Sequence, residues 1–360
     1  FGVARDGSHK STFQAGYELR AKYTVFAEGC RGHLGRRLEA RFGLRGAADP
    51  QHYGIGFKEI WQVDAAKHRP GEVLHTLGWP LDAATDGGGF VYHAADARLY
   101  VGLIVGLGYR NPHLDPYAEF QRWKGHPRIR ELLAGGQRIA YGSRAVNKGG
   151  LQSLPKVSFP GGVLVGCEAG YLNPAKIKGS HTAMKTGMLA AETIFAALAL
   201  QGPAADEELA RYEERVRGSW VWDELERGRN FSAGIAKLGT LFGGALAFVE
   251  QNVLQGRAPW TLRNRLPDHA CLRSAAASPV PQYPKPDGVV SFDRASSVFF
   301  SSTAHDEDQP VHLQLADPTI PIAVNLPRFA EPAQRYCPAG VYEVVEAADG
   351  VPHFKINATN

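Results

Sequence analysis

The sequence feature that most constrains the fold is a strand, glycine turn and helix pattern that occurs twice. Residues 18–27 read as a strand that becomes apolar at its end, Glu28–His33 is a glycine-bearing turn, and 34–42 read as a helix. The pattern returns at 163–166, followed by a Gly-rich stretch and a helix from about Ser180 to Leu200. This order of elements is typical of a nucleotide-binding α/β unit.

A different pattern separates the two units. Short apolar runs at 55–63, 73–79, 89–92 and 99–105 alternate with Gly, Pro and Asp turns, and short helices are predicted at 116–124 and 127–134. Such runs favour a mostly antiparallel sheet. The chain is therefore expected to begin one sheet, insert a second one and then resume the first.

The second half of the chain is predicted to be helical and then to change character. A charged amphipathic helix is predicted at 206–229 and an apolar segment at 231–255. Only twelve residues separate Lys237 from Glu250, whereas a spanning helix needs about 20 apolar residues. The segment either is a core helix or lies in a membrane interface. In the second case, the residues expected to face lipid are Leu238, Leu241, Phe242, Ala245, Phe248 and Val249.

The C-terminal region follows a stiff connector. Residues 279–288 contain four prolines, strands are predicted at 289–293 and 311–315, and the end of the chain is strand-like. The chain begins at Phe1 without a Met and stops without a polar tail. We therefore expect it to be an internal piece of a longer protein.

Composition excludes several classes of protein. The 360 residues carry 40 Lys and Arg against 36 Asp and Glu, and this mild charge of +4 does not predict nucleic-acid binding. No GxSxG, P-loop or HExxH motif is present, which removes support for hydrolase and NTPase functions. The four cysteines are far apart and without CxxC, so each is expected to be a buried free thiol.

Three stretches have residues suited to binding. In 163–185, a buried strand that ends in glycine precedes a helix, and the positive end of that helix suits the partial negative charge of a reduced flavin. In 85–90, three successive glycines expose backbone groups that fit a carbonyl ligand such as a quinone. Cys337 precedes a proline, as some iron–sulfur ligands do. On residues alone, an ordinary turn before a core helix explains the first stretch as well as a binding site does, while a loose hairpin is favoured for 85–90 and a buried cysteine for Cys337.

The sequence resembles the electron transfer flavoprotein–ubiquinone oxidoreductase family over essentially its whole length. The similarity is carried by runs in the family's order, and the longest include FAEGCRGHL from Phe26, YGIGFKEIW from Tyr53, KIKGSHTAMK from Lys176 and QRYCPAGVYE from Gln334.

The resemblance implies a mixed α+β and α/β fold made of intermixed domains. The FAD domain of the glutathione-reductase type would comprise 1–50 and 151–205, and the antiparallel ubiquinone domain 51–150. A helical segment would occupy 206–280, with its membrane-surface helix at 231–255, and an incomplete ferredoxin-like 4Fe–4S domain 281–360. It also implies an enzyme that sits on one face of a bacterial or mitochondrial inner membrane and passes electrons from reduced electron transfer flavoprotein to ubiquinone.

The resemblance also implies site residues, which fall into four roles. The quinone contacts fall on Gly87 and Gly88, the FAD contacts on Gly29, Gly166, Asn173, Gly179, Thr182 and Gly187, one cluster ligand on Cys337, and a phenol near the cluster on Tyr342. The family's GxGxxG and CxxCxxC motifs are absent from these 360 residues. Two alternatives therefore stay open: a related flavoprotein reductase or dehydrogenase that acts on a lipid without a cluster, and a non-catalytic quinone-binding remnant.

Overall fold

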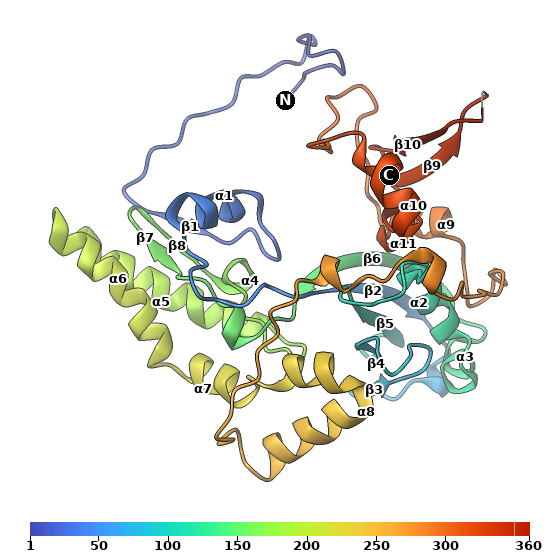
Figure 1. Cartoon of the computed structure of the whole chain (residues 1–360), viewed down its shortest axis with the longest axis horizontal. Coiled ribbons are helices and arrows are strands. Elements are labelled where there is room, and N and C mark those ends of the chain that lie inside the picture. Colours follow the sequence, from blue (N-terminus) through green and yellow to red (C-terminus); the bar gives the residue numbers. More distant parts are fainter. Residues whose placement is uncertain (349) are drawn as a thin grey trace.

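The fold is mixed α/β and is built around two separate sheets. The computed structural model describes residues 1–348 and 350–360. Within these residues the strands form a five-stranded, a three-stranded and a two-stranded sheet (Figure 1). The two larger sheets lie at opposite sides of the molecule, with helices between and below them (Figure 1).

The five-stranded sheet is the predicted insert. Its order is β3-β4-β5-β2-β6, and every neighbouring pair is antiparallel. The strands are β2 (Tyr53–Gln62), β3 (Val73–Leu77), β4 (Gly87–His93), β5 (Arg98–Gly106) and β6 (Gln137–Asn147), and the covering helices are α2 (Pro116–Lys124) and α3 (Pro127–Leu133). The prediction missed β6, because its arginines and glycine mask the alternation of apolar residues.

The sheet packs against α2 and α3 through large apolar side chains. Trp61, Phe120 and Trp123 are almost fully buried in this core, together with valines and leucines of β4 and β5. The core explains why these segments fold as one body, since burial of apolar surface contributes about 25 cal/mol per Å².

The two strand–turn–helix units join as predicted. β1 (Thr24–Phe26) pairs in parallel with β8 (Gly162–Leu164), and β7 (Ser158–Phe159) pairs antiparallel with β8. Around them lie α1 (His33–Phe42), α4 (Gly166–Ala169), α5 (Ser180–Leu198) and α6 (Pro203–Arg217). The strand predicted over 18–27 is confirmed only for its last residues, since 18–22 lack a neighbouring strand.

The helix predicted over 206–229 is two helices. α6 ends at Arg217, and α7 (Trp220–Arg227) begins after Gly218 and Ser219. α8 (Phe231–Asn252) follows and contains Gly239 at φ 74° and ψ 176°, a backbone conformation outside any helix. By length and composition, the run Trp220–Asn252 is the one candidate for a membrane span among the described residues. The break at Gly239 folds α8 back on itself (Figure 1).

The strands predicted at 289–293 and 311–315 are wrong. The carboxylate of Asp287 accepts the N–H groups of Val289, Val290 and Ser291, which closes a turn instead of a strand. Asp293 then accepts the N–H of Ser296 and so caps a helix. Residues 311–315 have no neighbouring strand.

The C-terminal region consists of short elements. They are α9 (Arg294–Phe299), α10 (Leu326–Phe329), α11 (Ala333–Tyr336), β9 (Tyr342–Glu346) and β10 (Pro352–Ile356). Single turns of 3-10 helix occur at Ala65–Lys67, Leu151–Ser153, Asp268–Cys271 and Ala275–Ala277, and a π-helical turn at Pro321–Asn325. β9 and β10 form an antiparallel hairpin, which agrees with the strand-like end of the sequence.

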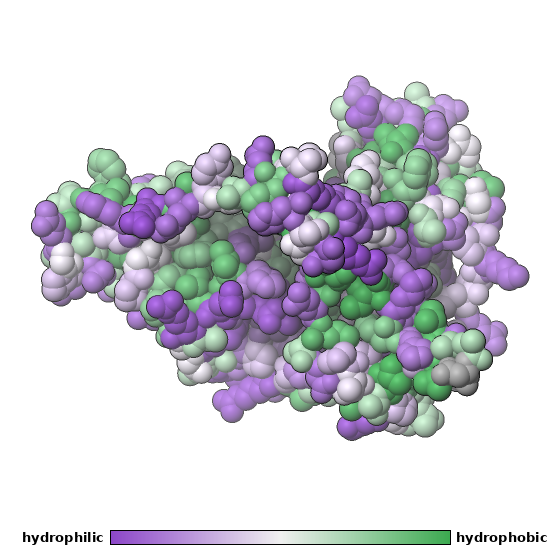
Figure 2. Space-filling view, turned by 90° about the horizontal axis from the view of Figure 1, so that it is seen from above, coloured by the Kyte–Doolittle hydropathy of each residue, from purple (hydrophilic) through white to green (hydrophobic). Residues whose placement is uncertain are grey.

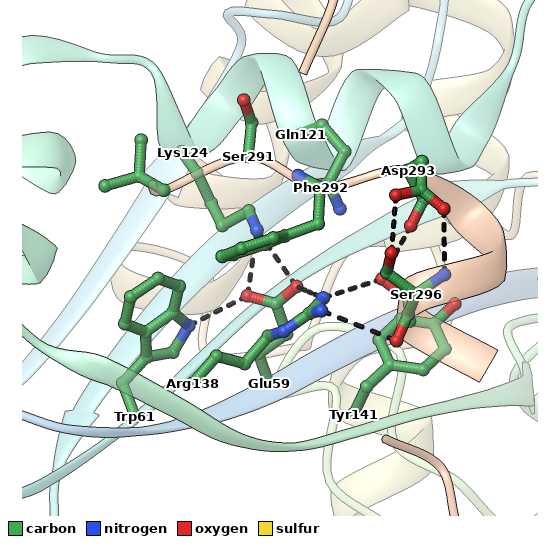
Figure 3. Close-up of polar contacts among 12 residues, drawn as sticks. Glu59, Trp61, Gln121, Lys124, Arg138, Tyr141, Ser291, Phe292, Asp293 and Ser296 are labelled. Carbon is green, nitrogen blue, oxygen red and sulfur yellow. Dashed lines mark hydrogen bonds and ion pairs between the residues drawn. The ribbon is translucent and has the colours of Figure 1, made fainter. Parts of the chain in front are cut away.

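A buried charged cluster attaches this region to the five-stranded sheet (Figure 3). Glu59 on β2 accepts hydrogen bonds from Lys124 on α2 at 2.8 and 2.9 Å and from Arg138 on β6 at 3.3 Å. Arg138 also donates to Ser297 Oγ at 2.7 Å, and its guanidinium lies 3.8 Å from the ring centre of Phe292. The cluster therefore joins β2, α2 and β6 to residues around α9.

Candidate functional site

The carboxyl ends of β1 and β8 lie at the same edge of their sheet, because the two strands are parallel. Val165 N–H donates to the Phe26 carbonyl at 3.1 Å, and a glycine with positive φ follows each strand, Gly29 at 88° and Gly166 at 56°. Glycine suits these positions because residues with a Cβ rarely adopt such φ values. The structure thus brings Gly29 and Gly166 to one edge, which is where α/β sheets bind ligands.

The start of α5 packs on this edge. Gly166 N–H donates to Thr186 Oγ1 at 3.0 Å, and a Cβ on Gly166 would lie 2.9 Å from Ala183. Gly179 precedes α5, and its carbonyl accepts a hydrogen bond from Thr182 Oγ1 at 2.9 Å. Gly166, Gly179 and Thr182 are therefore neighbours, and the Thr182 hydroxyl is used within the chain.

Asn173 is bound in the loop before α5. Its amide donates to Glu224 Oε1 at 2.9 Å, and its Oδ1 accepts the N–H groups of Ala175 and Lys176. Its side chain thus shapes the loop. Gly187 follows Thr186 on α5, and a Cβ on it would meet nothing within 4 Å.

Glu168 is the site residue that sequence reasoning missed. Its carboxylate lies against Gly32 and Gly35, where a Cβ on either glycine would overlap it, and its Oε2 is buried without a hydrogen-bond partner. Burial, followed by the nearby charge of Glu28, raises the pKa of Glu168 to about 7. A glycine-lined edge with an unpartnered carboxyl oxygen fits the polar portion of a flavin cofactor. No spacing pattern in the sequence distinguishes this glutamate.

A cavity of about 510 Å³ lies between the five-stranded sheet and the loop that leads into α5. On one side are residues that include Gly87, Gly88 and Lys148, and on the other is the loop 172–178. Lys178 Nζ donates to the Tyr92 hydroxyl across the cavity at 2.9 Å. In that loop, Ile177 has a φ of 53°, an outlier for a β-branched residue.

The strand register decides which backbone groups of the glycines face the cavity. Gly106 N–H donates to the Asp86 carbonyl, so alternate residues from Asp86 onward hydrogen-bond to β5, and Gly88 is directed toward Ile104. The N–H and C=O of Gly87 are directed the other way, toward β3. However, β3 ends at Leu77, which is opposite Gly88, so no β3 residue lies opposite Gly87. Gly87 therefore offers its N–H and C=O beyond the end of β3.

The predicted cluster ligand stands apart from this cavity. Cys337 is buried, and its Sγ accepts the N–H of Val341 at 3.4 Å. Burial, with a smaller effect of Cys337, raises the pKa of Tyr342. All four cysteines are free, as predicted, but only Cys337 is buried, while Cys30, Cys167 and Cys271 are half-buried.

Two family models match the chain. Residues 53–146, which form the five-stranded sheet, match the ubiquinone-binding region of ETF-QO, and residues 288–360 match the 4Fe-4S region of electron transfer flavoprotein-ubiquinone oxidoreductase. The two matches fall on opposite sides of the buried cluster at Glu59.

Curated relatives align over all of the chain. Electron transfer flavoprotein-ubiquinone oxidoreductase of Pseudomonas aeruginosa is 57% identical over 360 residues, which are 65% of that protein. The mitochondrial protein of that name from Rattus norvegicus is 50% identical over 367 residues, and the chain covers 59% of it. The chain thus spans less than two thirds of the length of these relatives.

Among solved structures, the chain is similar to a geranylgeranyl bacteriochlorophyll reductase-like protein from Thermoplasma acidophilum. The two are 21% identical with a TM-score of 0.49, over 65% of this chain and 55% of that one. This similarity is weak, and assignment to a family depends on the other comparisons. On the two family models and the curated relatives together, the chain belongs to the electron transfer flavoprotein–ubiquinone oxidoreductase family.

Proposed function

We propose that the protein passes electrons from reduced electron transfer flavoprotein through FAD and a 4Fe–4S cluster to ubiquinone. The names of its relatives and both family models support this oxidoreductase function. They do not favour the alternatives of a lipid-directed flavoprotein without a cluster or a quinone-binding remnant.

The observation that carries the proposal is the 510 Å³ cavity beside Gly87. Its walls come from the sheet matched by the ubiquinone-binding model and from the loop that leads into α5. Gly87 directs its N–H and C=O past the end of β3, and an N–H donor suits a quinone carbonyl oxygen. In this assignment Gly87 makes the hydrogen bonds, and Gly88 keeps the backbone close to the ring.

For FAD, the supporting residues are Gly29, Gly166 and Glu168 at the edge of the parallel strands. Gly179 and Thr182 position the start of α5, and Asn173 shapes the loop against the cavity. When bound, FAD supplies the redox chemistry, and these residues hold and orient it. Gly187, one residue after Thr186 on α5, completes the assigned FAD contacts, and a Cβ there would meet only open space.

For the cluster, the chain supplies one assigned ligand. A 4Fe–4S cluster takes about four protein ligands, whereas among the described residues no group of three or more His, Cys, Asp or Glu is placed to hold a metal ion. Cys337 is a suitable single ligand because the N–H of Val341 already points at its sulfur, a contact that tunes cluster potentials. We place Tyr342 beside it as a positioning phenol.

The proposed domain division assigns residues 1–50 and 151–205 to FAD and residues 51–150 to ubiquinone. The helical segment is 206–280, and the cluster domain is 281–360. α8 would rest on a membrane surface, as the hairpin at Gly239 exposes Leu241 and Phe242 at 72% and 70%. Thr240 N–H donates to the Ala83 carbonyl, which ties the bend of α8 to the loop before Gly87. A lipid-soluble quinone would then enter beside α8.

The test replaces Gly87 by alanine in the protein loaded with FAD and cluster. The added Cβ would lie 2.3 Å from the Ile104 carbonyl oxygen, so the strand must shift and the Gly87 groups turn away from the quinone. We expect the KM for ubiquinone to rise about tenfold, the equivalent of one lost hydrogen bond.

The matched control is Gly142→Ala on β6, where a Cβ meets nothing within 4 Å. It should leave the KM for ubiquinone unchanged. An unaltered KM in folded Gly87→Ala protein would argue against this quinone site, and absence of quinone reduction in the unmodified protein would refute the proposed function.

A further inference from the structure

A second cavity lies behind the wall of the quinone cavity. It measures about 290 Å³ and is lined on its polar side by His52, Arg110 and Asp268. Two residues, Asp86 and Lys148, line both this cavity and the 510 Å³ cavity. The two spaces are thus separated by a charged pair of side chains.

Lys148 lies within that wall. It is 8% exposed, and its ammonium forms an ion pair with the carboxylate of Asp86, which directly precedes Gly87. The side chain crosses two facing glycines: a Cβ on Gly106 would lie 3.2 Å from Lys148 Nζ, and one on Gly54 3.0 Å from its Cδ. Because these glycines have no side chains, the Lys148 side chain can pass over them and line both cavities.

On the far side, the second cavity contains a histidine–carboxylate pair. His52 Nδ1 lies 2.7 Å from Asp268 Oδ1, while Tyr53 N–H holds the other carboxylate oxygen at 2.8 Å. The His52 carbonyl accepts the backbone N–H of Lys148 at 2.6 Å. The backbone of His52 is therefore fixed relative to Lys148, and its ring is held between Asp268 and the Asn264 carbonyl, which lies 3.2 Å from Nε2.

The ionisation of these groups suits proton transfer. Burial lowers the pKa of Lys148 to about 8, and the charge of Asp268 offsets some of that fall. Burial alone would lower the pKa of His52, but the hydrogen bond and charge of Asp268 outweigh it and raise the pKa. The charged groups that line the two cavities around Lys148 are Asp86, Lys58, Lys176 and Lys178 on one side and His52, Asp268, Arg110 and Arg273 on the other.

We infer that Lys148 is the proton donor to the quinone oxygen held at Gly87, and that the His52–Asp268 cavity returns a proton to it. The inference rests on the proposed quinone function. It adds a proton route that passes through Lys148, since Lys148 and Asp86 are the residues that line both cavities.

The reaction balances as follows. A quinone takes two electrons, supplied by the reduced flavin and cluster of the proposed function, and two protons to become a quinol. The Nζ–H bond of Lys148 breaks as an O–H bond forms on the carbonyl oxygen near Gly87, and a neutral amine remains beside Asp86. His52 then gives its proton to that amine and regains one from solvent. The second quinone oxygen, at the opposite end of the ring, takes its proton from water.

Two substitutions of Lys148 separate proton donation from structural support. Lys148→Met removes charge and proton, whereas Lys148→Arg keeps the ion pair with Asp86 but cannot release its proton, because the pKa of arginine exceeds about 12. In the protein carrying FAD and cluster, we expect both variants to lower kcat for ubiquinone by about 100-fold, the low end for a positioned general acid. Reduction of a one-electron acceptor that binds no proton should stay at its original rate.

The pH profile gives an independent readout. Since Lys148 must carry its proton, kcat of the unmodified protein should fall as pH rises through about 8. Lys148→Arg should lack that fall. Lys67→Met is the control, a lysine of the same sheet domain whose Nζ donates to the carbonyls of Glu131 and Ala134.

The outcomes separate the two proposals. Quinone reduction by Lys148→Arg at the original rate would overturn the proton-donor role and leave the quinone site standing. If Lys148→Met does not fold, the arginine variant alone decides the matter. Electron flow to the one-electron acceptor without any ubiquinone reduction in the unmodified protein would overturn the proposed function itself.

Discussion

At the scale of single residues, the site depends on glycines that make room for particular neighbours. Gly32 and Gly35 leave space for Glu168, Gly89 for the indole of Trp123, and Gly106 for Lys148. Each of these contacts joins segments that are distant in the sequence. The sequence gives the positions of the glycines, but it does not indicate which side chains fill the space beside them.

The pKa of Glu168 leads to a prediction about stability and pH. Its pKa is raised from 4.5 to about 7 in the folded protein, chiefly by burial. The folded state therefore holds more protons than the unfolded state between these values, and the free energy of unfolding should fall as pH rises from about 4.5 to about 7. Glu168→Gln should remove this contribution, as measured by urea unfolding of flavin-free protein at several pH values.

Glu192→Gln, on an exposed position of α5, is the control and should follow the unmodified protein. Equal pH dependence in Glu168→Gln and the unmodified protein would show that this carboxyl group is not held in the buried, protonated state.

At the scale of elements, α8 shows how one backbone break changes the role of an apolar segment. The run Trp220–Asn252 is a candidate span by overall length and composition, although Lys237 and Glu250 leave only twelve uncharged residues between them. The turn at Gly239 agrees with the shorter reading, because residues 240–252 are the longer half of α8, about 20 Å against a bilayer core of about 30 Å. The face away from α8 mixes polar and apolar residues, with polar ones running along its middle (Figure 2). The exposed face of α8 carries Leu241, Phe242 and Phe248.

Membrane docking by α8 can be tested with the double variant Leu241→Glu and Phe242→Glu. Two charges on the exposed apolar face should release the protein from liposomes, since burying them in lipid costs several kcal/mol. The measurement is flotation with neutral phospholipid vesicles.

The double variant Gln251→Glu and Asn252→Glu adds the same charge at the polar end of α8. It should still float with the vesicles. Unchanged flotation of the Leu241 and Phe242 variant would mean that α8 does not dock the protein on lipid.

At the scale of the whole molecule, the buried cluster around Glu59 fixes the C-terminal region on the five-stranded sheet (Figure 3). Glu59 and Lys124 are fully buried, and Arg138 contacts Phe292, Phe300 and Ser297 beyond the sheet. Burying three charges is favourable only when each has partners. Here Trp61 Nε1 also donates to Glu59 at 2.8 Å, so the carboxylate accepts hydrogen bonds from three side chains, those of Trp61, Lys124 and Arg138.

Arg138→Ala should loosen this attachment. The substitution removes the contacts of the guanidinium with the rings of Phe292 and Phe300 and its hydrogen bond to Ser297. We expect the free energy of unfolding to fall by about 3–5 kcal/mol. Amide hydrogen exchange of residues 292–300 should rise more than exchange of β5. Arg144→Ala, on an exposed position of the same strand, should leave both unchanged, and equal protection in the two variants would mean that Arg138 does not hold the region in place.

Much of the fold follows from the sequence because its signals are local. Short apolar runs between Gly, Pro and Asp turns predicted β2 to β5. The helix predicted at 116–124 is α2, which begins at Pro116 after the capping Asp115. The same local signals failed where a side chain redirected the backbone, as Asp287 did at the predicted strand 289–293. They also failed at 206–229, where Gly218 and Ser219 separate a pair of helices within one amphipathic pattern.

The features of the candidate site also divide into those that the sequence determined and those that depended on the tertiary structure. The sequence alone determined the glycine turns, the free cysteines and, through its resemblance, the family. Only the tertiary structure decided that the backbone groups of Gly87, rather than those of Gly88, are directed past the end of β3. It also decided that Glu168 meets Gly32 and Gly35 and that Lys148 lines two cavities. The reason is that strand register and the packing of distant segments depend on contacts across the whole chain, and these leave no periodic mark on the residues that make them.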